Sequence, residues 1–470
     1  MITEPNGHGE SLLSSVNPSK AITRLAIPAT LALIAKALYN IVDTAYIGML
    51  GSETALAAVG VTLPLLLIFV SIENILAAGA AVLAGRQLGS DDRAGASITV
   101  STIVAASAFI GLGLCITGII FMEPLLRCFG ASDSVMPLAK DYAFWMFIAA
   151  IANLPAQSLN CAARAESSVR MSSIAVISGA LLNVVLDPIF MFRWGLNMGV
   201  EGASLATTVS QFVTLCILVS FYWGGNSIIK IKAKSIKPNI RLFKEVVLIG
   251  VPTAVIQICL AVATSLTNVA LSTLPDSDLV IAAYGVVQRL VLIGCYIIMG
   301  LMQGYQPVAS YSFGANNKKR FVESIRFAVK ATITLSLVVA SFYIVLSKPI
   351  LSLFNHNPAV LQYGSRLLVS QMAIYPAFGL CYLMTITFQT IGSPRYGLFL
   401  STIRQGLLYI PLIVVLPHIW GITGVYFAQP ISDVLTLVVC LLSYKAMVKT
   451  AANNMAGTQI MGSDALQQEA

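Results

Sequence analysis

The feature that most constrains this chain is a series of long apolar stretches between residues 22 and 448. We count about twelve, each of roughly 20 or more residues, which is the length that an α-helix needs to cross the ~30 Å hydrocarbon core of a bilayer. With 57% hydrophobic and only 10% charged residues, the chain is too apolar for a soluble globular protein. We therefore expect an all-α, polytopic membrane protein with about twelve transmembrane helices.

The basic residues predict how these helices are oriented. Most Lys and Arg residues fall at the termini or on the even-numbered connections, whereas the odd-numbered ones hold little beyond Arg127, Arg193 and Lys348. Because cytoplasmic loops carry an excess of Lys and Arg, we expect both termini in the cytoplasm and a multi-pass protein of the inner cell membrane. This placement also explains the net charge of +8 without nucleic acid as a partner. Residues 1–17 are polar, so we expect no cleavable signal peptide.

Catalytic and metal-binding motifs are missing from the sequence. The eight cysteines are scattered and none are spaced as CxxC, and there are only three histidines. The sequence has no GxxxxGK[ST] phosphate loop, no HExxH motif and no soluble domain that could house an ATPase. We therefore expect a protein that is not an enzyme, needs no cofactor and takes its energy from an ion gradient.

An internal repeat divides the chain into two halves. "LAAVGV" (56–61) matches "IAAYGV" (281–286), 225 residues later, and four further pairs occur in the same order in both halves, among them "EPLLRCFG" (123–130) with "KPILSLFN" (348–355). An even number of helices in each half predicts a parallel repeat of two pseudo-symmetric six-helix lobes around a V-shaped central cleft. This architecture favours a carrier that works by alternating access over a channel or a scaffold.

The repeat also predicts the boundaries of five parts. They are a cytoplasmic N-terminal tail (1–20), an N-lobe with helices 1–6 (21–223), a basic cytoplasmic linker (224–242), a C-lobe with helices 7–12 (243–448) and a cytoplasmic C-terminal tail (449–470).

Two acidic residues lie inside helices of the N-lobe at the same expected depth. Asp43 and Asp187 are each about five or six residues, or roughly 8 Å, from the outer end of their helices. Asn183 shares a helix face with Asp187, and Tyr142 and Thr207 can reach a similar level. Two carboxylates in a low-dielectric pocket cannot both ionise cheaply. They could exchange H⁺, or a Na⁺ ion could bind at Asp43, Asn183 and Asp187. Alternatively, Asp187 only caps a helix end before Pro188, and Lys36 neutralises Asp43.

Further polar residues are candidates for a substrate cavity or for helix movement. Lys36 and Glu73 could pair with each other or select the charge of a substrate, and Pro28 could be a hinge or a passive kink. Arg404 and Asp433 are expected at similar depth on the last hairpin and predict a structural ion pair. The candidate cavity residues are Lys36, Tyr39, Glu73, Asn153, Gln157 and Asn160.

Five stretches distributed along the chain carry a resemblance to a known family. They are "ALYNIVDTAYIGMLGSETALAAVGV", "GRQLGSDD", "LLNVVLDPIFMF", "GVEGASLATTVSQ" and "IRQGLLYIPLIVVLP". Together they resemble the multidrug and toxic compound extrusion (MATE) family, in its bacterial and archaeal branch with a cation site in the N-lobe. The resemblance implies an antiporter that exports amphipathic, often cationic drugs in exchange for H⁺ or Na⁺. It implies cation-coupling roles for Asp43, Asn183 and Asp187, with Tyr142 and Thr207 as hydrogen-bonding neighbours and Tyr39 and Asn160 as cavity-lining residues.

Two departures from the family pattern leave alternatives open. The seventh helix carries Gln257 and Asn268 where other branches have an acid, which argues against a C-lobe cation site, and Lys36 and Glu73 are unusual at their places. A related alternative is a flippase for a lipid-linked precursor, which would favour a more cationic cavity. We expect a monomer whose partners are drug-like amphiphiles and the lipid bilayer.

Overall fold

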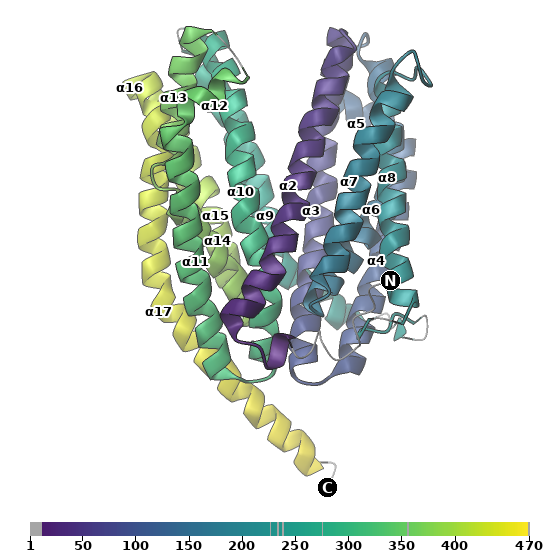
Figure 1. Ribbon diagram of the computed structural model, residues 1–470, viewed down its shortest axis with the longest axis vertical. Coiled ribbons are helices and arrows are strands. Elements are labelled where there is room, and N and C mark those ends of the chain that lie inside the picture. The colour runs from purple at the N-terminus through teal and green to yellow at the C-terminus, as the bar shows by residue number, and fades with distance from the viewer. Residues whose placement is uncertain are drawn as a thin grey trace. The chain divides into compact units, whose positions relative to one another are not determined.

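The computed structural model describes residues 12–225, 227–232, 235–236, 239–274, 276–354 and 357–468. These residues form helices and contain no β-strand (Figure 1). Eleven of the described helices are long and apolar enough to cross a membrane, and the count is twelve if one bent pair is a single span. The predicted all-α, polytopic membrane fold is confirmed. Residues 1–11 of the predicted N-terminal tail, and Lys234 and Lys237 of the predicted linker, lie outside the described residues.

From residue 18 onward, the described residues of the first half form six long helices and one short helix. The short helix follows the third long one and matches the "EPLLRCFG" end of the repeat. The helices are α2 (Pro18–Met49), α3 (Glu53–Gly89), α4 (Arg93–Ile120), the short α5 (Met122–Cys128), α6 (Met136–Ala165), α7 (Val169–Met191) and α8 (Val200–Trp223).

The second half repeats this order with more interruptions. Again a short helix follows the third long one, at the "KPILSLFN" end of the repeat, and a π-helical turn interrupts the penultimate span. The elements are α9 (Ile240–Ser272), α10 (Ser277–Gly314), α11 (Lys318–Val345), α12 (Ser347–Ser352), α13 (Pro358–Met372), α14 (Tyr375–Thr390), α15 (Pro394–Thr402), the π-helix η2 (Ile403–Tyr409), α16 (Ile410–Trp420) and α17 (Ile422–Gln468).

Contacts divide the chain into two compact units. Unit 1 contains Ile27–Gly250 and the residues up to Val16, and unit 2 contains Asn17–Ala26 and Val251–Ala470. The first turns of α2 therefore pack within unit 2, and the first turns of α9 within unit 1. The predicted lobe boundaries, 21–223 and 243–448, come from the sequence repeat. The two units are defined by contacts, so they begin and end at different residues.

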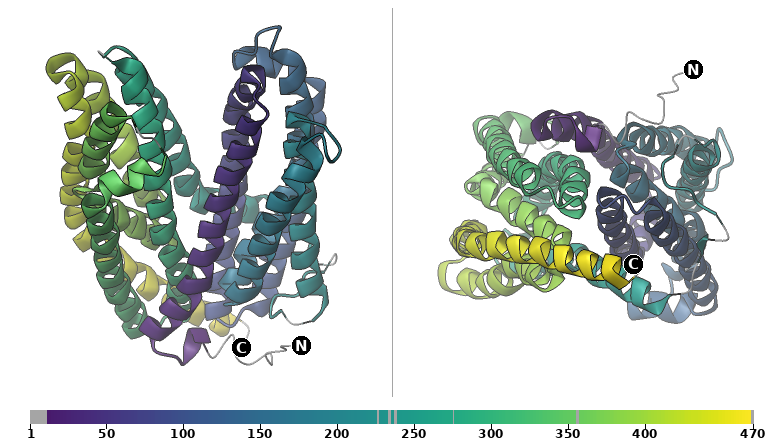
Figure 2. Two further views of the ribbon diagram at one scale, coloured as in Figure 1. Left: turned by 45° about the horizontal axis from the view of Figure 1, so that its top comes forward. Right: turned by 90° about the horizontal axis from the view of Figure 1, so that it is seen from below.

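Two spans differ in extent from the sequence prediction. One of the about twelve apolar stretches counted in the sequence consists of two helices, α13 and α14, which meet at a bend of 46°. Pro376 lies in the first turn of α14, and a proline disfavours helical continuation on its N-terminal side because it lacks an N–H and crowds the preceding turn. The last helix, α17, continues to Gln468 and projects beyond the other helices of unit 2 (Figures 1 and 2).

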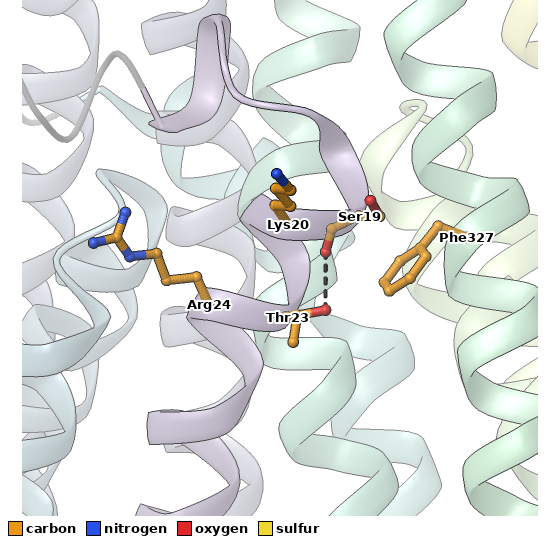
Figure 3. A pocket seen from close by; sticks show the side chains of 5 residues that line it. All are labelled: Ser19, Lys20, Thr23, Arg24 and Phe327. Carbon is orange, nitrogen blue, oxygen red and sulfur yellow. Dashed lines mark hydrogen bonds between the residues drawn. The ribbon is translucent and has the colours of Figure 1, made fainter.

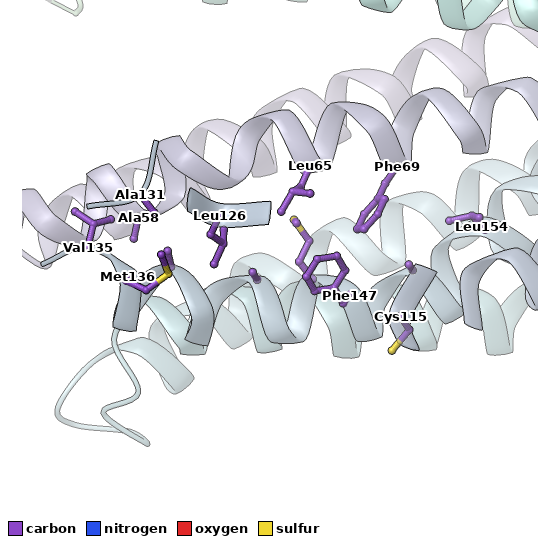
Figure 4. Packing of buried hydrophobic residues seen from close by; sticks show 14 residues of the cluster. Ala58, Leu65, Phe69, Cys115, Leu126, Ala131, Val135, Met136, Phe147 and Leu154 are labelled. Carbon is purple, nitrogen blue, oxygen red and sulfur yellow. The ribbon is translucent and has the colours of Figure 1, made fainter. Parts of the chain in front are cut away.

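Aromatic and aliphatic side chains fill the core of unit 1 where α3, α4, α5 and α6 meet (Figure 4). Phe69 and Phe147 contact each other in an edge-to-face arrangement with ring centroids 5.6 Å apart. Gly118 lies against the same ring, since a Cβ added there would be 2.2 Å from Phe147. This core fixes α6 between its neighbours, and α6 carries much of the polar site described below.

Glycines also let α9 approach α3 closely within unit 1. A Cβ at Gly79 would lie 2.0 Å from the carbonyl oxygen of Val246, and a Cβ at Gly250 would lie 1.9 Å from that of Ile75. Small residues at helix contacts let two backbones approach in a bilayer, where packing rather than the hydrophobic effect drives helix association.

We expect Gly79→Val and Gly250→Val each to lower the thermal unfolding temperature of the purified protein. Overpacking typically costs about 1–3 kcal/mol, and here the added atoms would meet backbone, which cannot move aside as a side chain can. The matched control is Gly113→Val, because Gly113 is exposed on α4 and a Cβ there meets nothing within 4 Å. Equal unfolding temperatures for all three variants would contradict the close contact.

The first part of the linker is tied to unit 1 by Glu166, which follows α6 and is buried. Its Oε2 atom accepts hydrogen bonds from Ser227 Oγ at 2.7 Å, Ile228 N at 2.9 Å and Ile229 N at 3.0 Å. Lys230 N donates to Ser97 Oγ at 3.0 Å, and the Ile229 side chain is fully buried. Burial raises the pKa of Glu166 from 4.5 to about 7, although these hydrogen bonds favour the ionised form.

We expect the attachment of this linker segment to strengthen as the pH falls from 8 to 6. A carboxyl with a raised folded-state pKa contributes stability that is fully present below pH 4.5 and is lost as the pH rises through about 7. Amide exchange of residues 227–230, corrected for intrinsic rates, should slow by up to about tenfold. Glu166→Gln should remove this pH dependence, and an unchanged pH profile in that variant would refute the role of Glu166.

Candidate functional site

The residues predicted to bind a cation come together within unit 1. We call Asp43, Tyr142, Asn183, Asp187 and Thr207 the acidic cluster; they lie on α2, α6, α7 and α8. The helical spacing of four residues places Asn183 and Asp187 one turn apart on one face of α7. Asn183 Nδ2 donates to Asp187 Oδ1 at 3.0 Å and to Thr207 Oγ1 at 3.2 Å.

The two acids of the cluster are neighbours in space. The Asp43 carboxylate lies close enough to Asp187 to act on it electrostatically, and both act on the phenol of Tyr142. Tyr39, one turn before Asp43 on α2, also lies within electrostatic reach of Tyr142. The structure therefore brings together the side chains that the depth argument predicted to be neighbours.

Burial leaves oxygen atoms of this cluster without partners. Asp187 is fully buried and Asn183 is 2% exposed. In the described part of the chain, Asp43 Oδ1, Asn183 Oδ1 and Asp187 Oδ2 are buried and accept no hydrogen bond. A buried polar atom without a partner is costly, and such oxygens are ligands for a proton or for a hard cation such as Na⁺.

The structure contradicts one of the two simpler interpretations of these acids. Asp187 does not cap a helix, because α7 continues through Pro188 to Met191 and Phe192 is its C-cap. Lys36 acts electrostatically on Glu73, and its neutralisation of Asp43 stays an alternative prediction.

Glu73 and Asn153 form a second polar group in the same unit. Asn153 Nδ2 on α6 donates to Glu73 Oε2 on α3 at 2.7 Å, and Glu73 is 3% exposed. Lys36 on α2 lies within electrostatic reach of this carboxylate. The predicted relation between Lys36 and Glu73 is thus electrostatic, with Asn153 as the hydrogen-bonding partner that the sequence did not assign to Glu73.

The remaining candidates on α6 lie in a hydrogen-bonded group near the end of that helix. Asn160 Oδ1 accepts from Arg164 Nη1 at 2.8 Å and from Ser172 Oγ, and Asn160 Nδ2 donates to Gln157 Oε1 at 3.4 Å. Asn160 is 5% exposed. Sequence reasoning missed Arg164 and Ser172 as its partners, although the spacing of four residues between Asn160 and Arg164 was a usable signal.

Unit 2 contains the predicted ion pair on the final hairpin. Arg404 Nε donates to Asp433 Oδ1 at 2.8 Å and Nη2 donates to Oδ2 at 3.4 Å, with Asp433 almost fully buried. Gln429 Nε2 also donates to Asp433 Oδ1, and the guanidinium lies 5.0 Å from the centre of the Phe378 ring. The prediction of a structural pair is confirmed, and Arg404 belongs to the π-helical turn η2.

The fold is that of a polytopic α-helical membrane protein, and its two halves contain long and short helices in the same order. The MatE family model matches the chain twice, over residues 28–189 and 252–415. The matches begin 224 residues apart and together cover more than half of the sequence. The chain therefore belongs to the MatE family, whose members are transporters rather than enzymes.

Individual relatives extend this similarity over most of the chain. The multidrug export protein MepA of Staphylococcus aureus (strain NCTC 8325 / PS 47) is 26% identical over 423 residues, which are 90% of this chain and 92% of MepA. MepA of Staphylococcus haemolyticus (strain JCSC1435) is 26% identical over 88% of this chain and 90% of its own length.

Solved structures share the fold. An outward-facing multidrug resistance MATE family transporter of the MOP superfamily superposes with a TM-score of 0.89 at 23% identity, covering 96% of this chain and 100% of its own. A MOP superfamily transporter from Pyrococcus furiosus Vc1 (DSM3638) superposes with a TM-score of 0.88, also at 23% identity and with the same coverage.

Proposed function

We infer that this protein exports amphipathic, often cationic small molecules from the cell by alternating access, in exchange for H⁺ or Na⁺ that moves inward. The observation that carries the proposal is the acidic cluster, in which two acids and an amide present unpartnered buried oxygens. The names of the MepA relatives support the substrate class. Buried ionisable residues inside membrane helices are typical of ion pathways.

Binding of a cation would change the energy of this cluster directly. With the site empty, Asp43 and Asp187 repel each other if both are ionised, and their free oxygens are desolvated without compensation. A proton or a Na⁺ ion between them relieves both costs. A conformation that holds the acids close is therefore favoured when the cation is bound, which is the differential binding that coupling requires.

A hinge at Pro28 would let α2 respond to that change. The division between the two compact units falls between Ala26 and Ile27 in α2 and between Gly250 and Val251 in α9. A proline follows each division within two residues, Pro28 in α2 and Pro252 in α9, inside the helix in both cases. Because proline removes a helical hydrogen bond, we assign both positions as hinges.

The polar group around Glu73 favours export of cations over a lipid-linked anionic substrate. A flippase for such a substrate needs positive charge that is free to contact it. Lys36 instead lies within electrostatic reach of a buried carboxylate, so its charge is offset within unit 1. Tyr39 and Gln157, both half-buried, complete the set that we assign to the substrate cavity.

The test uses purified protein in liposomes loaded with a fluorescent cationic dye. A pH gradient and a Na⁺ gradient are imposed separately, each without a membrane potential and with protein-free liposomes as the baseline. Dye movement that depends on one gradient would establish antiport and identify the ion. Absence of movement under both gradients, with the protein shown to be folded, would contradict export of cationic amphiphiles.

A further inference from the structure

A cavity of about 370 Å³ lies in unit 2 beside the first turns of α2. Its lining residues are Ser19, Lys20, Thr23 and Arg24 of α2 and Phe327 of α11. Lys20, Ser19 and Thr23 lie between the guanidinium of Arg24 and the ring of Phe327 (Figure 3). The cavity is separate from the acidic cluster, which belongs to unit 1.

Among the described residues, no acidic side chain pairs with the positive charge of the cavity. Lys20 and Arg24 are exposed and stand four residues apart, so their like charges share one face of α2 and repel. Within the described residues, neither side chain forms an ion pair. An anion bound between them would relieve this repulsion.

The hydroxyl groups of the cavity add a second requirement for the ligand. Ser19 Oγ donates its hydrogen to Asn17 Oδ1 at 2.8 Å, and Thr23 Oγ1 donates to the Ser19 carbonyl at 2.9 Å. Both oxygens therefore face a ligand as acceptors. The backbone amides of Ser19 and Ala21 already donate to Asn17. We therefore assign the contacts with the ligand to side chains.

One side of the cavity is apolar. The ring of Phe327 borders it from α11, opposite the basic and hydroxyl groups of α2. A ligand with an anionic, hydroxylated head and an apolar body would fit this lining.

We propose that this cavity binds the headgroup of an anionic glycerophospholipid with a hydroxylated head, of the phosphatidylglycerol class. Lys20 and Arg24 contact the phosphate, Ser19 and Thr23 accept hydrogen bonds from the glycerol hydroxyls, and the ring of Phe327 contacts the apolar part of the lipid. The volume is at the lower end of the range for ligand pockets, which suits a headgroup whose chains stay in the bilayer. Basic pockets on the cytoplasmic side, where the charge pattern places residue 20, recognise anionic lipid heads.

The test is a lipid titration of the full chain in detergent, followed by native mass spectrometry. Phosphatidylglycerol and phosphatidylcholine are compared for the wild type, for Lys20→Gln/Arg24→Gln and for the matched control Lys318→Gln/Lys319→Gln. The control removes the same charge from two exposed residues at the start of α11, outside the cavity. We expect the Kd for phosphatidylglycerol to rise roughly 30-fold in the cavity variant only.

Three outcomes would overturn the assignment. An equal loss of affinity in both variants would show general charge attraction. Equal binding of phosphatidylcholine would show that the cavity does not recognise the net negative charge of the lipid head. A thermal shift with inorganic phosphate equal to that with phosphatidylglycerol would make the cavity a site for soluble anions. Ser19→Ala/Thr23→Val should abolish the preference for phosphatidylglycerol over phosphatidic acid, and a retained preference would contradict the role of the hydroxyls.

Discussion

Asp43→Asn and Asp187→Asn are each expected to reduce gradient-driven dye export to the rate of protein-free liposomes. Asparagine keeps the size of the side chain, and at position 187 it keeps an oxygen that can accept the hydrogen bond from Asn183. It cannot bind a proton or carry the negative charge that a Na⁺ ion needs. The fold should therefore persist while the site can no longer change its state with the ion gradient.

The measurement compares initial rates of dye movement at equal protein density in the liposomes. Asp91→Asn is the matched control, because Asp91 lies in a turn with 90% of its side chain exposed and a positive φ that Asn tolerates. Elution as a single sharp peak in size-exclusion chromatography would show that each variant is folded. Wild-type export by a folded Asp43→Asn or Asp187→Asn protein would remove the acidic cluster from the mechanism.

Loss of the Arg404–Asp433 pair is expected to have the largest effect on stability. Asp433→Asn leaves a mostly buried guanidinium without its counter-charge, and breaking a buried pair from one side costs about 3–5 kcal/mol. Gln429 and the face of Phe378 also contact this pair, so their packing should loosen with it. We expect a markedly lower unfolding temperature for the purified variant in detergent.

A double variant separates the cost of an unpaired buried charge from the effect of losing the whole ion pair. Arg404→Leu/Asp433→Leu removes both charges, and replacing a whole buried pair by apolar side chains is often neutral or stabilising. It should therefore unfold at a higher temperature than Asp433→Asn. A double variant that is less stable than Asp433→Asn would show that the pair stabilises unit 2 beyond the mutual compensation of its charges.

The spans and the repeat could be predicted because their causes are local in the sequence. An apolar stretch long enough to cross the bilayer enters it as a helix whatever its neighbours are, since backbone groups in hydrocarbon must bond within the segment. The two matches of the family model follow the halves that the repeat predicted. The depth of Asp43 and Asp187 follows from counting residues along helices whose ends are known.

Contacts between helices depend on the rotation and closeness of whole helices, which short sequence patterns specify poorly. Asn153 meets Glu73 because α6 packs against α3, and Ser172 meets Asn160 because α7 returns along α6. The burial of Glu166 under the linker arises in the same way.

The sequence by itself determined the membrane class, the two halves, the ion pair on the last hairpin and the residues of the acidic cluster. Only the tertiary structure decided which oxygens of that cluster lack partners, where α13 and α14 bend, and that the first turns of α2 and α9 pack in opposite units. Insertion of a helix depends on the summed transfer energy of its own residues. The partner of a buried polar atom depends on how several inserted helices pack together.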